Sequence, residues 1–160
     1  MSMRIDFQAP ELNDLLKDFE RAGGRTDALM RAALTNSANR GQKEIRRRAA
    51  HRTGTLQRSV LTEVSRDNAE ISVNEKYGIF LEEGTGIYGP RHAPIVPRSA
   101  KALVFKPKGG GIVFAKRVSG MRAKPFFKPG YEASKPYFID QFQKVTDILT
   151  RALAGKGFGV

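Results

Sequence analysis

Hydrophobic residues recur at helical spacing along three stretches of the chain, which predicts three helices. Two of these helices are long enough to build a core. The first helix starts near Pro10, carries Leu12, Leu15, Leu16 and Phe19, and stops at Gly23. The second starts with Thr26 as N-cap and runs to about His51, with an inward line of Met30, Leu34, Ala38, Gly41, Ile45 and Ala49. Its small residues at 38, 41 and 49 indicate that another backbone approaches closely.

The third helical pattern is C-terminal, with a buried stripe of Phe138, Phe142, Val145, Leu149 and Ala152. We expect this helix to begin near Pro129 or Ser134, and Pro136 is tolerable only close to its start. The preceding Pro125–Pro129 stretch places two aromatic residues between prolines and predicts an extended anchor into the core.

Alternating patterns predict strands between these helices. Residues 4–8 form a short strand, Val60–Ser65 and Ala69–Asn74 form one hairpin, and Ala102–Lys106 and Ile112–Val118 form another. Gly54 ends the long helix and Thr55 caps a single turn on Leu56 and Ser59. The sequence therefore predicts an α+β fold. An antiparallel sheet of hairpins packs against two long helices, one before the sheet and one C-terminal. We expect a single domain over residues 1–160, with flexible ends at 1–8 and 155–160.

A long turn-rich loop interrupts the strands. Tyr77–Glu83 has the apolar spacing of one or two helical turns, and the glycines and prolines from Gly84 to Pro97 exclude regular structure after it. Because excursions of this length in small domains are functional or disordered, we interpret this one as functional.

The net charge of +12 favours an anionic partner, whether nucleic acid, an acidic protein surface or anionic lipid. The positive charge gathers in two regions. The end of the second helix carries Arg40, Lys43, Arg46, Arg47, Arg48 and Arg52, which either contact DNA or an acidic neighbour or form a solvated face at the helix C-terminus. The stretch from Tyr88 to Lys124 has no acidic residue, and its hairpin carries Lys106, Lys108, Lys116 and Arg117, which contact an anion or protect the sheet edge.

Residues that could support catalysis are present but not arranged for it. His51 and His92 lack the spacing of metal ligands, and Glu82 and Glu83 diverge on a helix because they are adjacent. There is no cysteine, no phosphate-binding loop, no secretory signal at the amino end and no apolar run long enough for a membrane span. We therefore predict no enzyme, no cofactor, no metal and no membrane association.

Three motifs in this order resemble the gene-product-ten-like family of tailed phages, typified by a minor tail or tail-completion protein of the siphophage Hong Kong 97. They are TGTLQRSV at Thr53–Val60, YGIFLEEGTG at Tyr77–Gly86 and PFFKPGYEA at Pro125–Ala133. The sequence departs from the family pattern at three positions. Gly78 and Gly130 stand where alanine is usual, and Glu82 is an additional acid before Glu83. The change at Gly130 is expected to loosen the start of the final helix.

The resemblance implies a structural protein of the virion neck that joins tail to head, or completes the tail, as a ring of identical subunits around the DNA channel. It would be assembled in the bacterial host cytoplasm, from an active phage or a prophage. Its partners would be itself, neighbouring neck and tail proteins, and nonspecific double-stranded DNA. We place the subunit or partner interface at Leu81, Glu83, Thr85, Ile87 and Tyr88.

Two other functions stay open. One is a monomeric nucleic-acid-binding module that uses the basic helix and the hairpin. A more distant one is a nuclease built on Glu82, Glu83 or Asp67.

Overall fold

The computed structural model describes residues 3–7, 17, 20–21, 26–66, 68–107 and 109–155. The chain separates into two compact units. Unit 1 comprises Met1–Glu75 and Phe127–Val160, and unit 2 comprises Lys76–Phe126. The α+β class predicted from the sequence is confirmed, with a helix before the sheet and a long C-terminal helix. The single-domain boundary of 1–160 stays a prediction.

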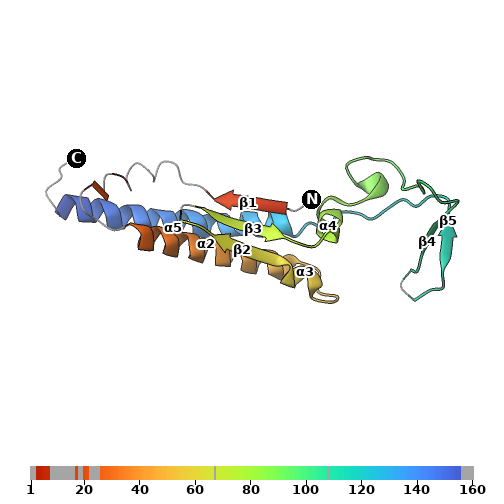
Figure 1. Ribbon diagram of the computed structural model, residues 1–160, viewed down its shortest axis with the longest axis horizontal. Coiled ribbons are helices and arrows are strands. Elements are labelled where there is room, and N and C mark those ends of the chain that lie inside the picture. Colours follow the sequence, from red (N-terminus) through yellow and green to blue (C-terminus); the bar gives the residue numbers. More distant parts are fainter. Residues whose placement is uncertain are drawn as a thin grey trace. The chain divides into compact units, whose positions relative to one another are not determined.

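Unit 1 is built on two long helices that run side by side in opposite directions, α2 (Asp27–Arg48) and α5 (Phe127–Gly155) (Figure 1). The predicted inward line of α2 is confirmed, since its buried residues include Met30, Leu34, Ala38, Gly41 and Ile45. The predicted stripe of α5 faces it. Met30 and Ala33 pack with Val145 and Leu149, and Phe142 and Ala152 lie at the margin of this cluster.

Two predicted ends of α2 need correction. Thr26 holds the N-cap position, but its hydroxyl donates a hydrogen bond to Glu20 Oε1 at 2.8 Å and makes no cap bond to the helix. At the other end the helix stops at Arg48 rather than near His51. Ala49 turns to extended backbone there, although its N–H still donates to the carbonyl of Ile45.

Helix α5 begins at Phe127, two residues before the earlier of the two predicted starts, so Pro136 lies inside it. Phe126 and Phe127 are both buried, as the aromatic pair between prolines predicted, but the extended part of this anchor ends at Phe126.

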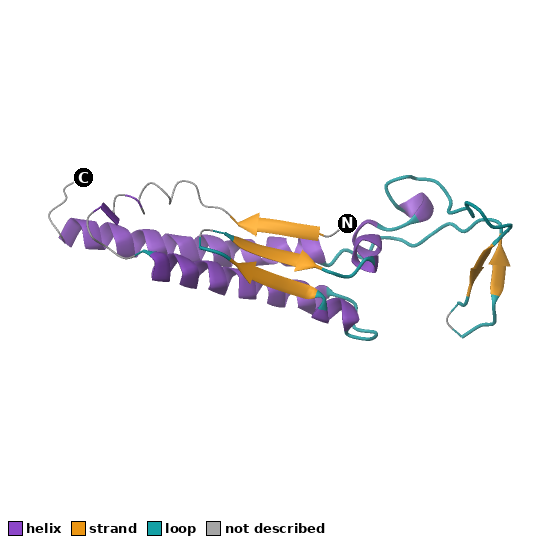
Figure 2. Cartoon of the chain, viewed as in Figure 1, coloured by secondary structure: helices purple, strands orange, loops and turns teal. Residues whose placement is uncertain are grey.

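A three-stranded antiparallel sheet lies on the helix pair, in the order β1-β3-β2 (Figure 2). Its strands are β1 (Met3–Phe7), β2 (Val60–Val64) and β3 (Ala69–Val73), which confirms the short amino-terminal strand and the first hairpin. Val60 pairs with Val73 and Ile71 with Ile5 in the register. Ala69, Ile71, Val73 and Val60 are buried, whereas Leu61 faces outward at 39% exposure, so one face of the sheet closes the core.

The short helix α3 (Thr55–Arg58) precedes β2. The sequence had placed Thr55 as its cap and Gly54 as the end of the long helix. Instead Gly54 is the N-cap residue of α3, with a φ of 69° that favours glycine, and Thr55 is already helical.

Unit 2 contains α4 (Tyr77–Glu83), the 3₁₀ turn η1 (Gly86–Tyr88), and the strands β4 (Leu103–Phe105) and β5 (Val113–Ala115). The predicted helical turns at Tyr77–Glu83 and the predicted second hairpin are confirmed, although each strand is shorter than expected. The hairpin forms a two-stranded sheet of its own. The predicted helix through Leu12 and Phe19 and the predicted flexible end after residue 155 lie outside the described residues.

Candidate functional site

The loop after α4 is tied down where two glycines cross. Gly86 and Gly120 have φ values of 65° and 93°, and a Cβ atom on Gly86 would lie 2.1 Å from the carbonyl oxygen of Ser119. A Cβ atom on Gly120 would lie equally close to the carbonyl oxygen of Thr85. We call residues 84–89 and 119–121 the glycine crossing. No side chain fits at its centre, which explains the Gly-Thr-Gly part of the second motif.

Main-chain hydrogen bonds join the two segments of the glycine crossing. The Thr85 N–H donates to Met121 O and the Ile87 N–H donates to Ser119 O, both at 2.8 Å. The Met121 N–H donates in return to the Thr85 hydroxyl at 2.9 Å. Thr85 is thus bonded through both its backbone and its side chain, which accounts for a threonine between the two glycines.

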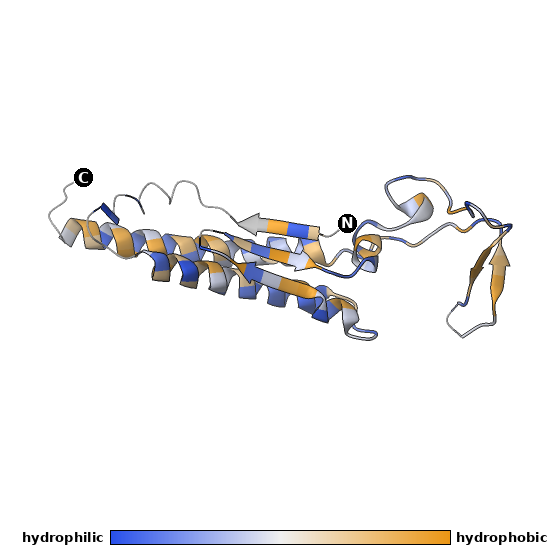
Figure 3. Ribbon diagram, viewed as in Figure 1, coloured by the Kyte–Doolittle hydropathy of each residue, from blue (hydrophilic) through white to orange (hydrophobic). Residues whose placement is uncertain are grey.

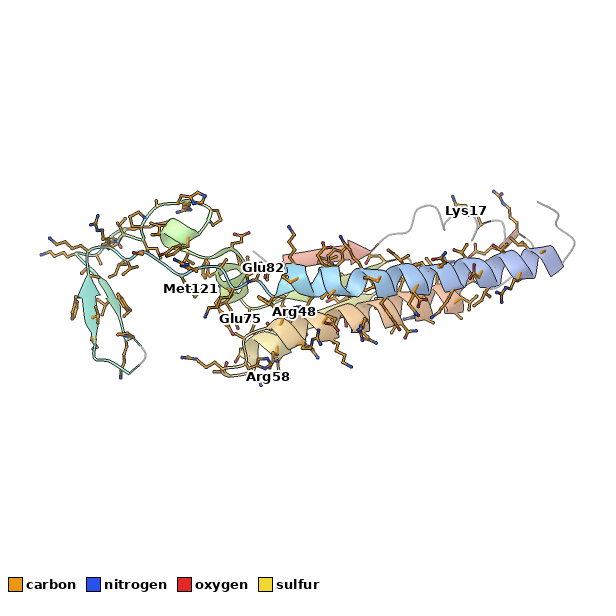
Figure 4. The ribbon with its side chains drawn as sticks, turned by 180° about the vertical axis from the view of Figure 1, so that it is seen from behind. Lys17, Arg48, Arg58, Glu75, Glu82 and Met121 are labelled. Atoms are coloured by element: carbon orange, nitrogen blue, oxygen red, sulfur yellow. The ribbon has the colours of Figure 1, made fainter. Side chains whose placement is uncertain are left out.

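The doubled acid of α4 has a structural use that the sequence did not reveal. Glu82 Oε2 accepts a hydrogen bond from the Phe126 N–H at 2.7 Å, and the Leu81 carbonyl accepts one from the Lys124 N–H at the same distance. Both bonds tie α4 to the segment that leaves unit 2. Figure 4 labels Glu82 and Met121, which lie in this unit.

The five predicted interface residues divide between internal and outward positions. Thr85 and Leu81 are half-buried and take part in the bonds just described. Glu83, Ile87 and Tyr88 are exposed, and the guanidinium of Arg122 lies 5.2 Å from the centre of the Tyr88 ring. The outward three remain candidates for contact with a neighbour, whereas the inward two have local structural roles.

The β4–β5 hairpin exposes apolar residues on both of its faces. In its register Val104 lies opposite Phe114 and Phe105 opposite Val113, so the two pairs point to opposite sides. Phe114 is 71% exposed and Val104 is 60% exposed. Figure 3 shows β5 as a hydrophobic strand. Since an isolated two-stranded ribbon is at best marginally stable in water, we interpret this hairpin as incomplete without a partner.

Unit 2 is also strongly basic, with ten lysines and arginines against two glutamates in its sequence. The predicted contact residues Lys106, Lys116 and Arg117 are exposed, and Lys108 lies outside the described residues. Among the residues that the structure describes, no cation of unit 2 forms an ion pair, so their charge is available to an outside partner.

The basic end of α2 is different, because a buried glutamate neutralises much of it. Glu44 is 5% exposed, and its carboxylate pairs with Arg47 at 2.8 Å, with Arg40 at 3.3 Å and with Arg48. The hydrogen bond from Arg48 and the charges of Arg47 and Arg40 lower the pKa of Glu44 below its ordinary value. Arg48 also donates to the Glu44 carbonyl. Glu44 is therefore the centre of this cluster of arginines.

Arg46 is used internally as well. Its guanidinium donates to the carbonyl of Val60 at 2.8 Å, beside the amide of Gln42, which donates to the same oxygen. Its own carbonyl accepts from Gln57 Nε2 at 3.0 Å. These bonds join α2 to β2 and α3. The basic residues that the sequence assigned to one solvated or DNA-contacting face therefore fall into two groups. Arg46 and Arg48 are half-buried, whereas Lys43 and Arg52 are exposed. Figure 4 labels Arg48, near the end of α2.

The described residues offer no metal centre, because no three histidine, aspartate or glutamate side chains among them gather closely enough. His51 Nδ1 lies 2.9 Å from Gln57 Nε2, and His92 sits in the loop with a φ of 47°. None of the helices described here is long and apolar enough to cross a membrane.

Part of this chain matches a known protein family. Residues 13–84 match the family described as "Bacteriophage HK97-gp10, putative tail-component". This range contains the first motif and most of the second. No curated protein and no solved structure matches the chain. The match agrees with the resemblance carried by the first two motifs, and this part of the chain is similar to the HK97 gp10-like phage tail components.

Proposed function

We propose that this protein is a structural subunit of the phage neck or tail, which assembles in several copies as a ring around the DNA channel and joins or completes the tail at the head. It acts in the virion by shape and charge, without catalysis. Its partners are other copies of itself, the neighbouring neck and tail proteins, and the DNA that passes through the channel.

The observation that carries this proposal is the uncovered β4–β5 hairpin. Val104 and Phe114 on one face, and Phe105 and Val113 on the other, are all at least 38% exposed. Contiguous apolar surface of this kind marks a protein-interaction site. A hairpin with two uncovered faces is suited to contact two neighbours, which a closed ring of subunits supplies.

The second candidate is a monomeric nucleic-acid-binding module, favoured by the unpaired cations of unit 2. Phosphate contacts would use lysines and arginines without base specificity. They would leave Phe114 and Val104 in water, however, so this candidate explains the charge of unit 2 but not its apolar strands.

The test is to delete the gene from the phage or prophage genome that encodes this chain and to examine the particles by negative-stain electron microscopy. We expect tailless heads beside free tails, restored to complete virions by the wild-type gene. Complete virions without the gene would end the proposal.

A matched pair of variants then tests the hairpin. Phe114→Ser should keep the circular dichroism spectrum of the wild type but fail to restore virions. Ile139→Ser on α5 replaces a residue with a similarly exposed side chain, at 65%, and should restore them. A fully active F114S protein would contradict the role given to the hairpin.

A further inference from the structure

The outer face of the three-stranded sheet in unit 1 carries carboxylates in register. Glu63 on β2 lies directly opposite Glu70 on β3. Like charges directly opposite each other destabilise a sheet. A protein that keeps such a pair on a surface has a use for its negative charge there.

This acidic row is only partly compensated within the described chain. Arg4 forms an ion pair with Glu70 at 3.0 Å, whereas Glu63 is exposed and has no ion pair among the described residues. Leu61, two residues before Glu63 and on the same face of β2, is 39% exposed. The face therefore offers negative charge next to an apolar contact.

Unit 2 offers the complementary surface. Its β4–β5 hairpin presents exposed apolar side chains, and exposed lysines stand at both ends of the strands, Lys101 before β4, Lys106 after it and Lys116 after β5. From Gly84 to Phe126 the sequence has no acidic residue.

We propose that the hairpin of unit 2 in one copy docks on the outer sheet face of unit 1 in the next copy. The inference rests on the proposed function, because it specifies the contact between ring subunits. The two surfaces are different patches of the same chain, so the contact is heterologous and leads to a ring or a filament rather than a closed dimer. Opposite charge sets the register of such a contact and excludes wrong pairings.

A protein surface fits the hairpin better than DNA does. Burial of Phe114 and Val104 against another subunit removes apolar area from water, whereas a phosphate backbone pairs with the lysines and leaves that area exposed. DNA binding by unit 2 is retained as an outcome of the test.

The test is a charge swap between two forms of the gene, read by complementation of the deleted phage. The sheet form carries Glu63→Lys and Glu70→Lys, and the hairpin form carries Lys101→Glu, Lys106→Glu and Lys116→Glu. Each form alone places like charges at every contact and should lower the yield of complete virions by about tenfold or more. The two forms expressed together should recover assembly where they alternate around the ring, because each contact between unlike forms joins opposite charges again.

Controls separate this contact from other effects. Glu132→Lys with Asp140→Lys changes the net charge as much as the sheet form does, but on α5, and should leave the yield near that of the wild type. A single chain with all five swaps should also assemble. Thermal melting of each purified form establishes that it is folded.

Either of two results overturns the inference. One is a single-surface form that assembles as well as the wild type. The other is a folded five-swap chain that does not recover. If the hairpin form lowers the yield of complete virions and the sheet form does not, the hairpin of unit 2 contacts DNA or another tail protein instead. The proposed role in the tail is tested separately, by whether the wild-type gene restores tails to the deleted phage.

Discussion

Gly130 of α5 lies against the backbone of Ile45 in α2. A Cβ atom on Gly130 would stand 2.7 Å from the Cα atom of Ile45 and 2.9 Å from its nitrogen, closer than nonbonded atoms approach. The sequence had suggested that glycine here, in place of the alanine usual in the family, loosens the start of the last helix. Instead the glycine lets two helices meet backbone to backbone, three residues after the first residue of α5.

Gly130→Ala should therefore destabilise the protein, although alanine is the better helix former by about 1 kcal/mol. Overpacking against a fixed backbone costs about 1–3 kcal/mol, and this exceeds the gain in propensity. Urea unfolding of the variant measures the difference. Gly155→Ala is the control, because a Cβ atom there meets nothing within 4 Å, and it should be neutral or slightly stabilising. A G130A protein as stable as the wild type would contradict the close contact.

The glycine crossing predicts a second pair of variants. Gly86→Ala places a Cβ atom on the Ser119 carbonyl oxygen in a backbone conformation that alanine disfavours, so the bonds of Thr85 and Ile87 should break. Hydrogen exchange should then lose protection at these two amides. Gly111→Ala, in open space within the hairpin turn, should keep it. Unchanged exchange in G86A would show that the crossing does not order the loop.

Glu44 predicts a loss of stability in acid. Its pKa is lowered in the folded state from the ordinary value of 4.5, first by the hydrogen bond from Arg48. A group with a lowered folded pKa contributes its stabilisation fully above the unfolded value and loses it as the pH falls through the folded value. The contribution of Glu44 should thus be intact above about pH 4.5 and disappear below it.

The comparison of two carboxyl variants checks this assignment. Glu44→Gln removes the charge-assisted bond from Arg48 and the charge that attracts Arg40 and Arg47, so we expect a cost of about 1.5–3 kcal/mol at pH 7 and a flatter stability profile in acid. Asp140 also has a lowered pKa, through its hydrogen bond with Lys144, but this pair is exposed. Asp140→Asn should therefore resemble the wild type at each pH, because exposed pairs contribute little. Equal profiles for E44Q and the wild type would exclude Glu44 as the source.

Arg46 and Arg47 are adjacent, yet their substitutions should differ. Arg46→Ala removes the bond to the Val60 carbonyl and should lower the free energy of unfolding by about 1–3 kcal/mol. The side chain of Arg47 is 67% exposed, and Arg47→Ala should change stability by no more than about 0.5 kcal/mol. Reversal of the charges of Arg46, Arg47 and Arg48 together should unfold the end of α2, because Arg46 and Arg48 are bonded within unit 1. Melting temperatures that fall equally in R46A and R47A would contradict this division.

The sequence predicted those parts of the fold that a periodic pattern encodes. The inward line of α2, the stripe of α5 and the β2–β3 hairpin follow from spacing alone, because each buries one side against its neighbour. The β4–β5 hairpin was predicted from its run of apolar and β-branched residues on either side of a glycine turn, although it buries neither face. Helix ends were less predictable. Helix α2 ends at Arg48 without a glycine or proline to mark the position. Helix α5 starts at Phe127, ahead of two prolines that both lie within it.

The sequence composition predicted which regions carry charge, but it did not predict which charged side chains contact one another. Charge counts cannot tell that Glu44 is buried among arginines while the described lysines of unit 2 form no ion pair. The use of Glu82 was missed for the same reason, since its partner, the Phe126 amide, lies 44 residues away. A doubled acid at the end of a short helix was the available signal.

The glycine crossing has a consequence for how this protein can change over generations. Its bonds join mainly backbone atoms, at Thr85 with Met121 and at Ile87 with Ser119, and the bonds between Ile95 and Val118 continue the same pairing beyond it. A scaffold of this kind tolerates almost any side chain on the surface it displays, provided that its glycines stay. The residues that this loop presents to a neighbour are thus free to diversify while the frame that carries them is inherited unchanged.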